Sequence, residues 1–196
     1  RNQLNQSKPI QAGPTPLSEH RCARRIPPMK ASITQPGPHT PSQDFSALMA
    51  TPFGALGIVS DGQYLRGIEF LPPGHSTTAP ANTIAEMALH QLGYYLADPD
   101  YRFDLPLAPG GSEYRRRIWA AIAAIPRGTT CTYGELAQTA NSAARAVGQA
   151  CGDNPFPIVV PCHRVVAATG LGGFAHDSGG FLIDTKRWLL HHEGVL

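Results

Sequence analysis

The chain lacks long hydrophobic runs, and its cysteines do not follow the spacing of a zinc site or a dense disulfide framework. No apolar stretch approaches the roughly 20 residues that span a bilayer, and no secretory signal pattern occurs. The four cysteines, Cys22, Cys131, Cys151 and Cys162, form no CxxC pair and no Cys/His cluster. We therefore expect a cytoplasmic protein with no membrane contact, no metal and no cofactor.

A surplus of charge of one sign is also missing. The 196 residues carry a formal charge of +2, with 42% hydrophobic and 15% charged side chains, which suits one or two small domains. Residues 49–196 hold ten basic and twelve acidic side chains, a formal charge of −2. Any binding of nucleic acid must therefore depend on local basic patches and helix N-termini rather than on overall charge.

Residues 1–48 differ from the rest of the chain. They contain eight prolines, many Ser, Thr and Gln residues, and six basic against two acidic side chains. Such a segment cannot bury enough apolar surface to offset its ordering entropy, so we expect it to be disordered. Two interpretations stay open: a weak electrostatic tether to nucleic acid, or sequence upstream of the true start, since Met49 directly precedes the ordered pattern. We favour the second.

The ordered pattern divides at Pro109-Gly110-Gly111, and its first half, residues 49–110, predicts a small α/β domain. Apolar residues from Phe53 to Ile58 lead into Asp61-Gly62, a hairpin signal, and the chain returns as a second strand up to Leu71. Asn82 is placed to cap a helix with apolar residues at helical spacing. Arg102 to Leu107 predicts another short strand. No candidate site is apparent in this half.

The second half, from residue 111, predicts short helices. Apolar residues from Tyr114 to Ile125 recur on one helical face, and Pro126-Arg127-Gly128 ends that helix. Thr132 can cap a short helix through Gln138, and Ser142 can start another that runs to Ala150. Two short helices joined by a tight turn are typical of a helix-turn-helix.

The last of these helices is built almost entirely of Ala, Gly and Val around Arg145. Its smooth surface allows close approach to another helix or to a nucleic-acid groove. A positive charge near a helix start opposes the helix dipole, which a bound phosphate would explain. A solvated arginine would explain it equally well.

Cys162 and His163 follow the apolar run from Ile158 to Val160, and Pro161 separates this run from Cys162. A thiol is useful mainly when a neighbour helps it lose its proton. In an extended strand the two side chains would point to opposite faces, so cooperation requires Cys162 to lie in a turn or a helical start. The alternative interpretation is a small buried cysteine beside a surface histidine.

Four motifs together resemble the O6-alkylguanine-DNA alkyltransferase family. The resemblance is dense over residues 113–196, loose over 49–110 and absent from 1–48. Its motifs are IPRGTTCTYGELA at 125–137, AARAVG at 143–148, the segment from Asn154 to Val165, and KRWLLHHE at 186–193. The resemblance implies an α/β protein with a small ribonuclease-H-like domain (49–110) and a helical, winged-helix-like DNA-binding domain (111–196). It also implies a monomer that acts on double-stranded DNA containing alkylated guanine.

The resemblance further implies the chemistry of the site. Cys162 would accept the alkyl group, His163 would act as its base through a water, and Glu193 would orient the histidine. Asn154 would brace the turn that carries Cys162, and Tyr133 would donate a proton or hydrogen bond to the guanine ring. The product would be a thioether, which water does not hydrolyse, so each molecule would act once.

The resemblance also assigns DNA contacts and a substrate pocket. Arg145 would enter the base stack and hold the place of an extruded nucleotide. Main-chain groups of Val165 would read the base edge, and Phe174 would wall the pocket. Further DNA contacts are implied at Thr132, Tyr133, Ala144, Ala146 and Gly148.

The segment at residues 171–185 is longer than in compact family members, which affects the choice of pocket-lining residues and the size of the alkyl group that fits. Three other functions remain alternatives. One is a cysteine hydrolase using Cys162, His163 and Glu193. The second is a non-catalytic lesion-binding DNA module, and the third is a structural protein with a merely buried cysteine. Arg164 is expected in an ion pair with a structural role.

Overall fold

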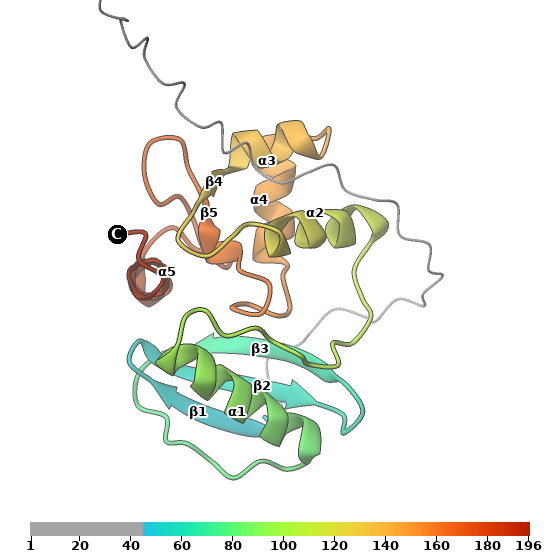
Figure 1. The fold of residues 1–196 in the computed structure, drawn as a ribbon, viewed down its shortest axis with the longest axis vertical. Coiled ribbons are helices and arrows are strands. Elements are labelled where there is room, and N and C mark those ends of the chain that lie inside the picture. The colour runs from blue at the N-terminus through green and yellow to red at the C-terminus, as the bar shows by residue number, and fades with distance from the viewer. Residues whose placement is uncertain (1–44) are drawn as a thin grey trace, which may run out of the picture.

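The computed structural model describes residues 45–196 and contains a small antiparallel sheet and five α-helices (Figure 1). Strands β1 (Ala47–Thr51), β2 (Gly54–Ser60) and β3 (Leu65–Leu71) form an antiparallel meander. The predicted hairpin is confirmed, but its connection spans residues 61–64 instead of the two predicted residues Asp61-Gly62. Asp61 Oδ1 holds this connection by accepting from the Gln63 and Tyr64 amides. The sequence did not predict β1. Its first residues, Ala47 and Leu48, fall in the segment 1–48 that was expected to be disordered, so that expectation is wrong for them, and residues 1–44 lie outside the described part of the chain.

Helix α1 (Thr83–Ala97) covers one face of this sheet (Figure 1). The predicted cap is confirmed, because the Asn82 side chain accepts a hydrogen bond from the Ala85 amide at 3.0 Å. The buried stripe of the helix ends at Tyr95, in its last turn. That position brings the Tyr95 side chain out of the sheet domain and toward the other half of the molecule.

The strand predicted from Arg102 to Leu107 is wrong. The segment makes a single bridge to β3, in which the Leu65 amide donates to Pro106 O and the Ala108 amide donates to Leu65 O, both at 2.8 Å. Pro106 has no N–H to donate, so a regular ladder cannot continue through it. The segment is an extended connector along β3.

The second half is built from α2 (Glu113–Ala123), α3 (Tyr133–Thr139), α4 (Ala144–Gly152) and α5 (Gly180–His192). The parallel pair β4 (Cys131–Thr132) and β5 (Val165–Val166) joins the α2–α3 connection to the segment after Cys162. These pieces are short, so side-chain hydrogen bonds hold much of this half together. The helix-turn-helix prediction corresponds to α3 and α4, which pack against each other.

The two predicted helix starts in this pair have different outcomes. Thr132 caps α3 in a capping box with Glu135, as expected. Ser142 does not cap α4, which begins at Ala144 without a side-chain cap. The Ser142 hydroxyl instead hydrogen-bonds the Tyr114 hydroxyl of α2 at 2.8 Å, so a tertiary partner takes the group that local sequence assigned to the cap.

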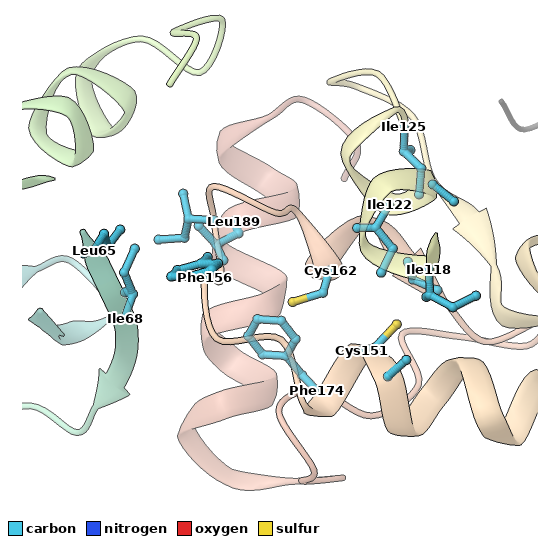
Figure 2. Packing of buried hydrophobic residues seen from close by; sticks show 14 of the residues in the cluster. Leu65, Ile68, Ile118, Ile122, Ile125, Cys151, Phe156, Cys162, Phe174 and Leu189 are labelled. Carbon is cyan, nitrogen blue, oxygen red and sulfur yellow. The ribbon is translucent and has the colours of Figure 1, made fainter. Parts of the chain in front are cut away.

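One hydrophobic core extends through both halves (Figure 2). Leu65 and Ile68 of β3 lie on one side, and Ile118 and Ile122 of α2 on the other, with Cys162 between them. The Ile68 amide also donates to Pro155 O at 2.9 Å, across the two halves. In residues 45–196 no helix combines the length and apolar character needed to cross a bilayer.

Candidate active site

A tight turn places Cys162 at the start of a short helix. The 3-10 helix η1 (Cys162–Arg164) follows Pro161, and the Arg164 amide donates to Pro161 O at 3.0 Å. The preceding Ile158 has φ 74°, a left-handed conformation that costs a β-branched residue energy and marks an imposed backbone path. The prediction that Cys162 lies in a turn or helical start is confirmed.

Asn154 is bonded across the loop that carries the cysteine. Its Nδ2 donates to Val160 O at 2.9 Å and to Cys162 Sγ at 3.3 Å, and its Oδ1 accepts from the Phe156 amide at 3.0 Å. One side chain thus connects both ends of the loop and the sulfur itself. The bracing position expected for Asn154 is present.

His163, Arg164 and Glu193 form a buried polar cluster behind the cysteine. His163 and Glu193 are fully buried, with His163 Nε2 2.9 Å from Glu193 Oε1. Arg164 donates from Nε to Oε2 at 2.8 Å and from Nη2 to Oε1 at 2.9 Å, which confirms the expected ion pair. His163 Nδ1 is buried and has no partner among the described residues. Because Nε2 faces a carboxylate, Nδ1 is the nitrogen left with a lone pair.

The pKa values follow from this burial and pairing. Burial lowers the pKa of His163, against the effect of Glu193, so the imidazole stays neutral. Burial alone would raise the pKa of Glu193, but hydrogen bonds from His163 and Arg164 and the charge of Arg164 hold it well below its usual range. Burial raises the pKa of Cys162, opposed by the Asn154 hydrogen bond and the Lys186 charge. The resting thiol is therefore protonated and needs a base to react.

Cys162 opens on a cavity of about 400 Å³ between α3, α4 and the loop before α5. Tyr133 and Phe174 line it, and Figure 2 shows the Phe174 ring near Cys162. The Tyr133 hydroxyl donates to Gly173 O at 3.0 Å, and burial raises the pKa of this tyrosine, which keeps it a neutral donor. A second free thiol, Cys151 on α4, lines the same cavity.

Lys186 is a functional candidate that the sequence reasoning missed. Its side chain is fully buried, and Nζ donates to the carbonyls of Val165, Leu171 and Gly173 at 2.7, 2.6 and 3.0 Å. Burial lowers its pKa to about 8. Its signal in the sequence was a lysine on the apolar stripe that also carries Leu189 and Leu190. Lys186 holds the pocket loop and places a positive charge near Cys162.

The long segment after β5 folds over the cavity. Ala175 and His176 both have positive φ, and Phe174 and Asp177 exchange backbone hydrogen bonds at 2.8 and 2.9 Å. His176 Nε2 lies 3.0 Å from Asp153 Oδ1, and its ring covers Gly152 so closely that a Cβ there would lie 2.4 Å from it. This segment therefore forms a turn that closes one wall of the pocket.

The predicted DNA-contact residues lie on α3 and α4. Arg145 is exposed at the start of α4 and makes no hydrogen bond or ion pair with residues 45–196. Ala144 and Gly148 line the cavity mouth, while Ala146 is half-buried outside it. The Thr132 hydroxyl is already engaged with Glu135. Arg145 is the one basic residue among the predicted DNA contacts, and its side chain is exposed on this face.

Elsewhere, the described residues contain a larger cavity without a cysteine in its lining, and they contain no cluster of metal ligands. A larger cavity of about 850 Å³ lies between the connector at 99–103 and the end of α2, but its lining contains no cysteine. Among the described residues no group of three or more His, Cys, Asp or Glu side chains could hold a metal ion. The chemistry of a nucleophile with a base is therefore concentrated at Cys162.

A buried thiol with a histidine–glutamate pair, opening on a cavity beside two short helices, defines a cysteine-centred site of the group-transfer or hydrolase class. Comparison with known proteins narrows this class. Residues 113–195 match the family described as "6-O-methylguanine DNA methyltransferase, DNA binding domain". A relative from Methanosarcina acetivorans named methylated-DNA–protein-cysteine methyltransferase is 37% identical over 158 residues, which is 76% of this chain and 98% of the relative.

A relative of the same name from Salmonella typhimurium is 38% identical over 170 residues, covering 76% of this chain and 94% of its own length. Among solved structures, the O6-methylguanine methyltransferase of Mycobacterium tuberculosis is similar with a TM-score of 0.63 and 35% identity, over 75% of this chain and 90% of that one. A structure of the Mycobacterium tuberculosis protein in complex with DNA gives 0.62 and 36%, over 75% and 91%. The chain belongs to the methylated-DNA–protein-cysteine methyltransferase family.

Proposed function

We propose that this protein repairs alkylated DNA by transferring the alkyl group from O6 of guanine to the sulfur of its own Cys162. Membership of the family supports transfer from methylated DNA to a protein cysteine, because that is the name its relatives carry. One observation carries the assignment to Cys162: this thiol lines the cavity and adjoins the buried His163–Glu193 pair. The substrate is double-stranded DNA with an alkylated guanine.

In the proposed reaction His163 is the base. A water between Cys162 and Nδ1 of His163 passes the thiol proton to the imidazole, and Glu193 stabilises the resulting positive charge. The thiolate attacks the alkyl carbon, the new S–C bond forms, and the electrons of the C–O bond move to the guanine oxygen. The unpaired Nδ1 and the neutral state of the imidazole support this role.

Tyr133 and Asn154 serve the leaving group and the nucleophile respectively. Tyr133, a neutral hydroxyl on the cavity wall, exchanges its hydrogen bond to Gly173 for one to the guanine ring. It passes its proton to the ring as the C–O bond breaks, so that the base departs neutral. Solvent then re-protonates Tyr133 and takes the former thiol proton from His163. Asn154 holds the loop and donates to the sulfur, which favours the thiolate once it forms. Val165 main-chain groups and Phe174 bind the base and wall the alkyl pocket.

Arg145 is the residue proposed to replace the extruded nucleotide. It is exposed at the start of α4, beside the cavity that would receive the base. Contacts from Thr132, Ala144, Ala146 and Gly148 along α3 and α4 complete the DNA face. We also propose that residues 111–196 form a winged-helix-like domain and residues 49–110 a ribonuclease-H-like domain. A monomer in the cytoplasm, associated with the nucleoid in action, fits the proposal.

The thioether formed on Cys162 makes the protein a single-use reagent. Water does not cleave an S–C bond of this kind. The neighbouring free thiol Cys151 cannot regenerate Cys162, because thiol–disulfide exchange breaks S–S bonds and not S–C bonds. One protein molecule is consumed for each lesion.

Labelled duplex DNA tests the assignment. The protein is incubated with a duplex containing methyl-labelled O6-methylguanine, and the label is located by peptide mass. We expect one label per molecule on Cys162, complete loss of transfer in Cys162→Ser, and near-normal transfer in Cys151→Ser, its matched control. Burial raises the pKa of Cys151, and among the described residues its thiol has no counterpart of the Asn154 hydrogen bond that Cys162 receives, so it should not accept the group. Repeated turnover or label on Cys151 would overturn the proposal.

The same assay with O4-methylthymine in the duplex tests a second substrate. We propose that this adduct is also accepted, because the reaction is the same displacement at a carbon attached to an exocyclic oxygen. The measurement is the amount of label on Cys162 relative to the guanine substrate. Absence of transfer from the thymine adduct would restrict the substrate to guanine and leave the first proposal intact.

A further inference from the structure

The sheet half contributes one side chain to the buried cluster behind Cys162. Tyr95, in the last turn of α1, is 2% exposed, and its hydroxyl donates to Glu193 Oε1 at 2.8 Å. Among residues 45–108 it is the one side chain hydrogen-bonded to that cluster. The Tyr95 main chain is also bonded to the end of α5, next to Glu193, because His192 Nε2 donates to Tyr95 O at 2.8 Å. Its ring packs against Phe103 and meets the His192 ring edge-on.

The oxygen that Tyr95 contacts is the one that faces the catalytic imidazole. Glu193 Oε1 accepts from Tyr95, from His163 Nε2 at 2.9 Å and from Arg164 Nη2 at 2.9 Å, whereas Oε2 accepts from Arg164 Nε. A third donor on Oε1 fixes the rotation of the carboxylate and withdraws negative charge from this oxygen. The proton between His163 and Glu193 then stays on the histidine.

We propose that Tyr95 is a positioning residue for alkyl transfer: its hydroxyl holds Glu193 so that His163 keeps its proton on Nε2 and offers Nδ1 to the thiol. Tyr95 touches neither substrate nor thiol and acts through Glu193. This inference rests on the proposed role of His163 as base. It also gives the sheet half a direct part in the site, in addition to its structural one.

Other groups near Glu193 set the background for any pH effect. Arg127 Nη1 donates to the Glu193 main-chain carbonyl at 3.2 Å and pairs with Asp100 of the connector. The charge of Lys186 acts on both His163 and Cys162. The charged and titratable groups facing the pair are Cys162, Arg164, Tyr95, Arg127, His192 and Lys186. Replacing the Tyr95 hydroxyl by hydrogen changes none of these charges.

The test compares Tyr95→Phe with Tyr94→Phe. Tyr94 is the neighbouring residue on the same helix, is 58% exposed, and packs on Tyr101. Single-turnover transfer from an O6-methylguanine duplex is measured at saturating protein from pH about 5.5 to about 8.5. We expect Tyr95→Phe to lower the first-order rate about 3- to 10-fold at neutral pH, with unchanged DNA affinity. Tyr94→Phe should match the unaltered protein.

The pH profile separates positioning from packing. Without the hydroxyl, Glu193 carries more negative charge and favours the imidazolium, so His163 stays protonated to higher pH and is lost as a base. The acidic limb of the rate profile should therefore shift to higher pH by about half to one pH unit. Nitrogen NMR of labelled histidine should show the His163 titration moving in the same direction, without any use of DNA.

Two results would overturn the proposal. One is a Tyr95→Phe protein whose rate, acidic limb and His163 titration equal those of Tyr94→Phe. The other is a Tyr95→Phe protein whose loss of rate only follows a lower DNA affinity or a lower free energy of unfolding, while the acidic limb of the rate profile and the His163 titration do not move. That result would make Tyr95 a packing residue. An NMR shift without any effect on transfer would contradict His163 as the base and leave the Tyr95–Glu193 contact itself confirmed.

Discussion

The two halves of the molecule are stabilised in different ways, and the difference explains where its chemistry lies. In the sheet half, regular ladders of backbone hydrogen bonds join strands of five to seven residues, and one helix covers them. In the helical half, elements of two or three residues surround the thiol, and side chains such as Asn154, Arg164 and Lys186 bond the loops between them.

This contrast matters because a regular ladder of backbone hydrogen bonds persists when many of its side chains are replaced. A loop that is held by one side-chain amide or one side-chain ammonium group loses its support when that residue is replaced. The active half places strained backbone and buried charge next to the cysteine, at Ile158, Glu193 and Lys186. The helical half packs against the sheet half, and the Tyr95 side chain of the sheet half contacts the site directly. Three variants test how sharply the halves differ.

The largest effect is expected for Glu193→Gln. It leaves Arg164, whose side chain is only 13% exposed, without its counter-ion, so we expect a loss of about 3–5 kcal/mol in the free energy of unfolding at neutral pH. The pKa of Glu193 is depressed in the folded protein, so its contribution is present above its unfolded value of 4.5 and is lost as pH falls below that. The deficit of the variant should therefore narrow below pH 4.5.

Urea unfolding at several pH values measures this difference. The matched control is Glu69→Gln, because Glu69 is an exposed carboxylate on β3 of the sheet half. We expect that control to change stability by less than about 0.5 kcal/mol. An equal loss in both variants would mean that the buried cluster contributes no more to stability than a surface charge does, and that the two halves do not differ in this respect.

An intermediate effect is expected for Arg145→Ala, on activity alone. Its side chain is exposed and unpaired within the described residues, so stability should stay within about 0.5 kcal/mol. Transfer from duplex DNA should fall about 10- to 100-fold, because extruding a base costs a few kcal/mol that the inserted arginine offsets. Transfer from free O6-methylguanine base should hardly change.

The comparison variant is Arg102→Ala, which removes an exposed arginine from the connector of the sheet half. It should leave both reactions unaltered. Equal losses on duplex and free base in Arg145→Ala would exclude a role in base extrusion, and an equal loss in Arg102→Ala would point to a general effect of positive charge.

The smallest effect is expected for Asn82→Ala in the sheet half. Loss of the cap of α1 should lower the free energy of unfolding by about 1 kcal/mol. The single-turnover rate at a temperature where the protein stays folded should not change, because Asn82 lies at the opposite end of α1 from Tyr95. A clear drop in rate with retained fold would show that the start of α1 also influences the site.

Local patterns were sufficient for much of the fold. The Asp61-Gly62 hairpin, the Asn82 and Thr132 caps and the helix before Pro126 depend on neighbours within a few residues, and each is present. Errors arose where a distant partner decided the outcome. The Ser142 hydroxyl pairs with Tyr114, and the connector at 102–107 follows β3 without forming a strand.

The candidate site shows the same division. The family motifs named Cys162, His163, Glu193, Asn154 and Tyr133 because these residues stand at fixed separations in the sequence. The sequence also restricted Cys162 to a turn or a helical start if it cooperates with His163, because adjacent side chains of a strand point to opposite faces, and the structure places it at the start of η1. No local signal pointed to Tyr95, because a tyrosine on the apolar stripe of a helix is typical of a core residue.

By itself, then, the sequence determined the family, the acceptor thiol and the local shape of most elements, because short-range sterics and capping are encoded by adjacent residues. Only the tertiary structure decided which groups meet across the chain. It placed the Tyr95 hydroxyl on Glu193, 98 positions away, and buried Lys186 among three loop carbonyls. Such contacts depend on how two halves pack, and burial then sets the protonation of the thiol, the imidazole and the carboxylate.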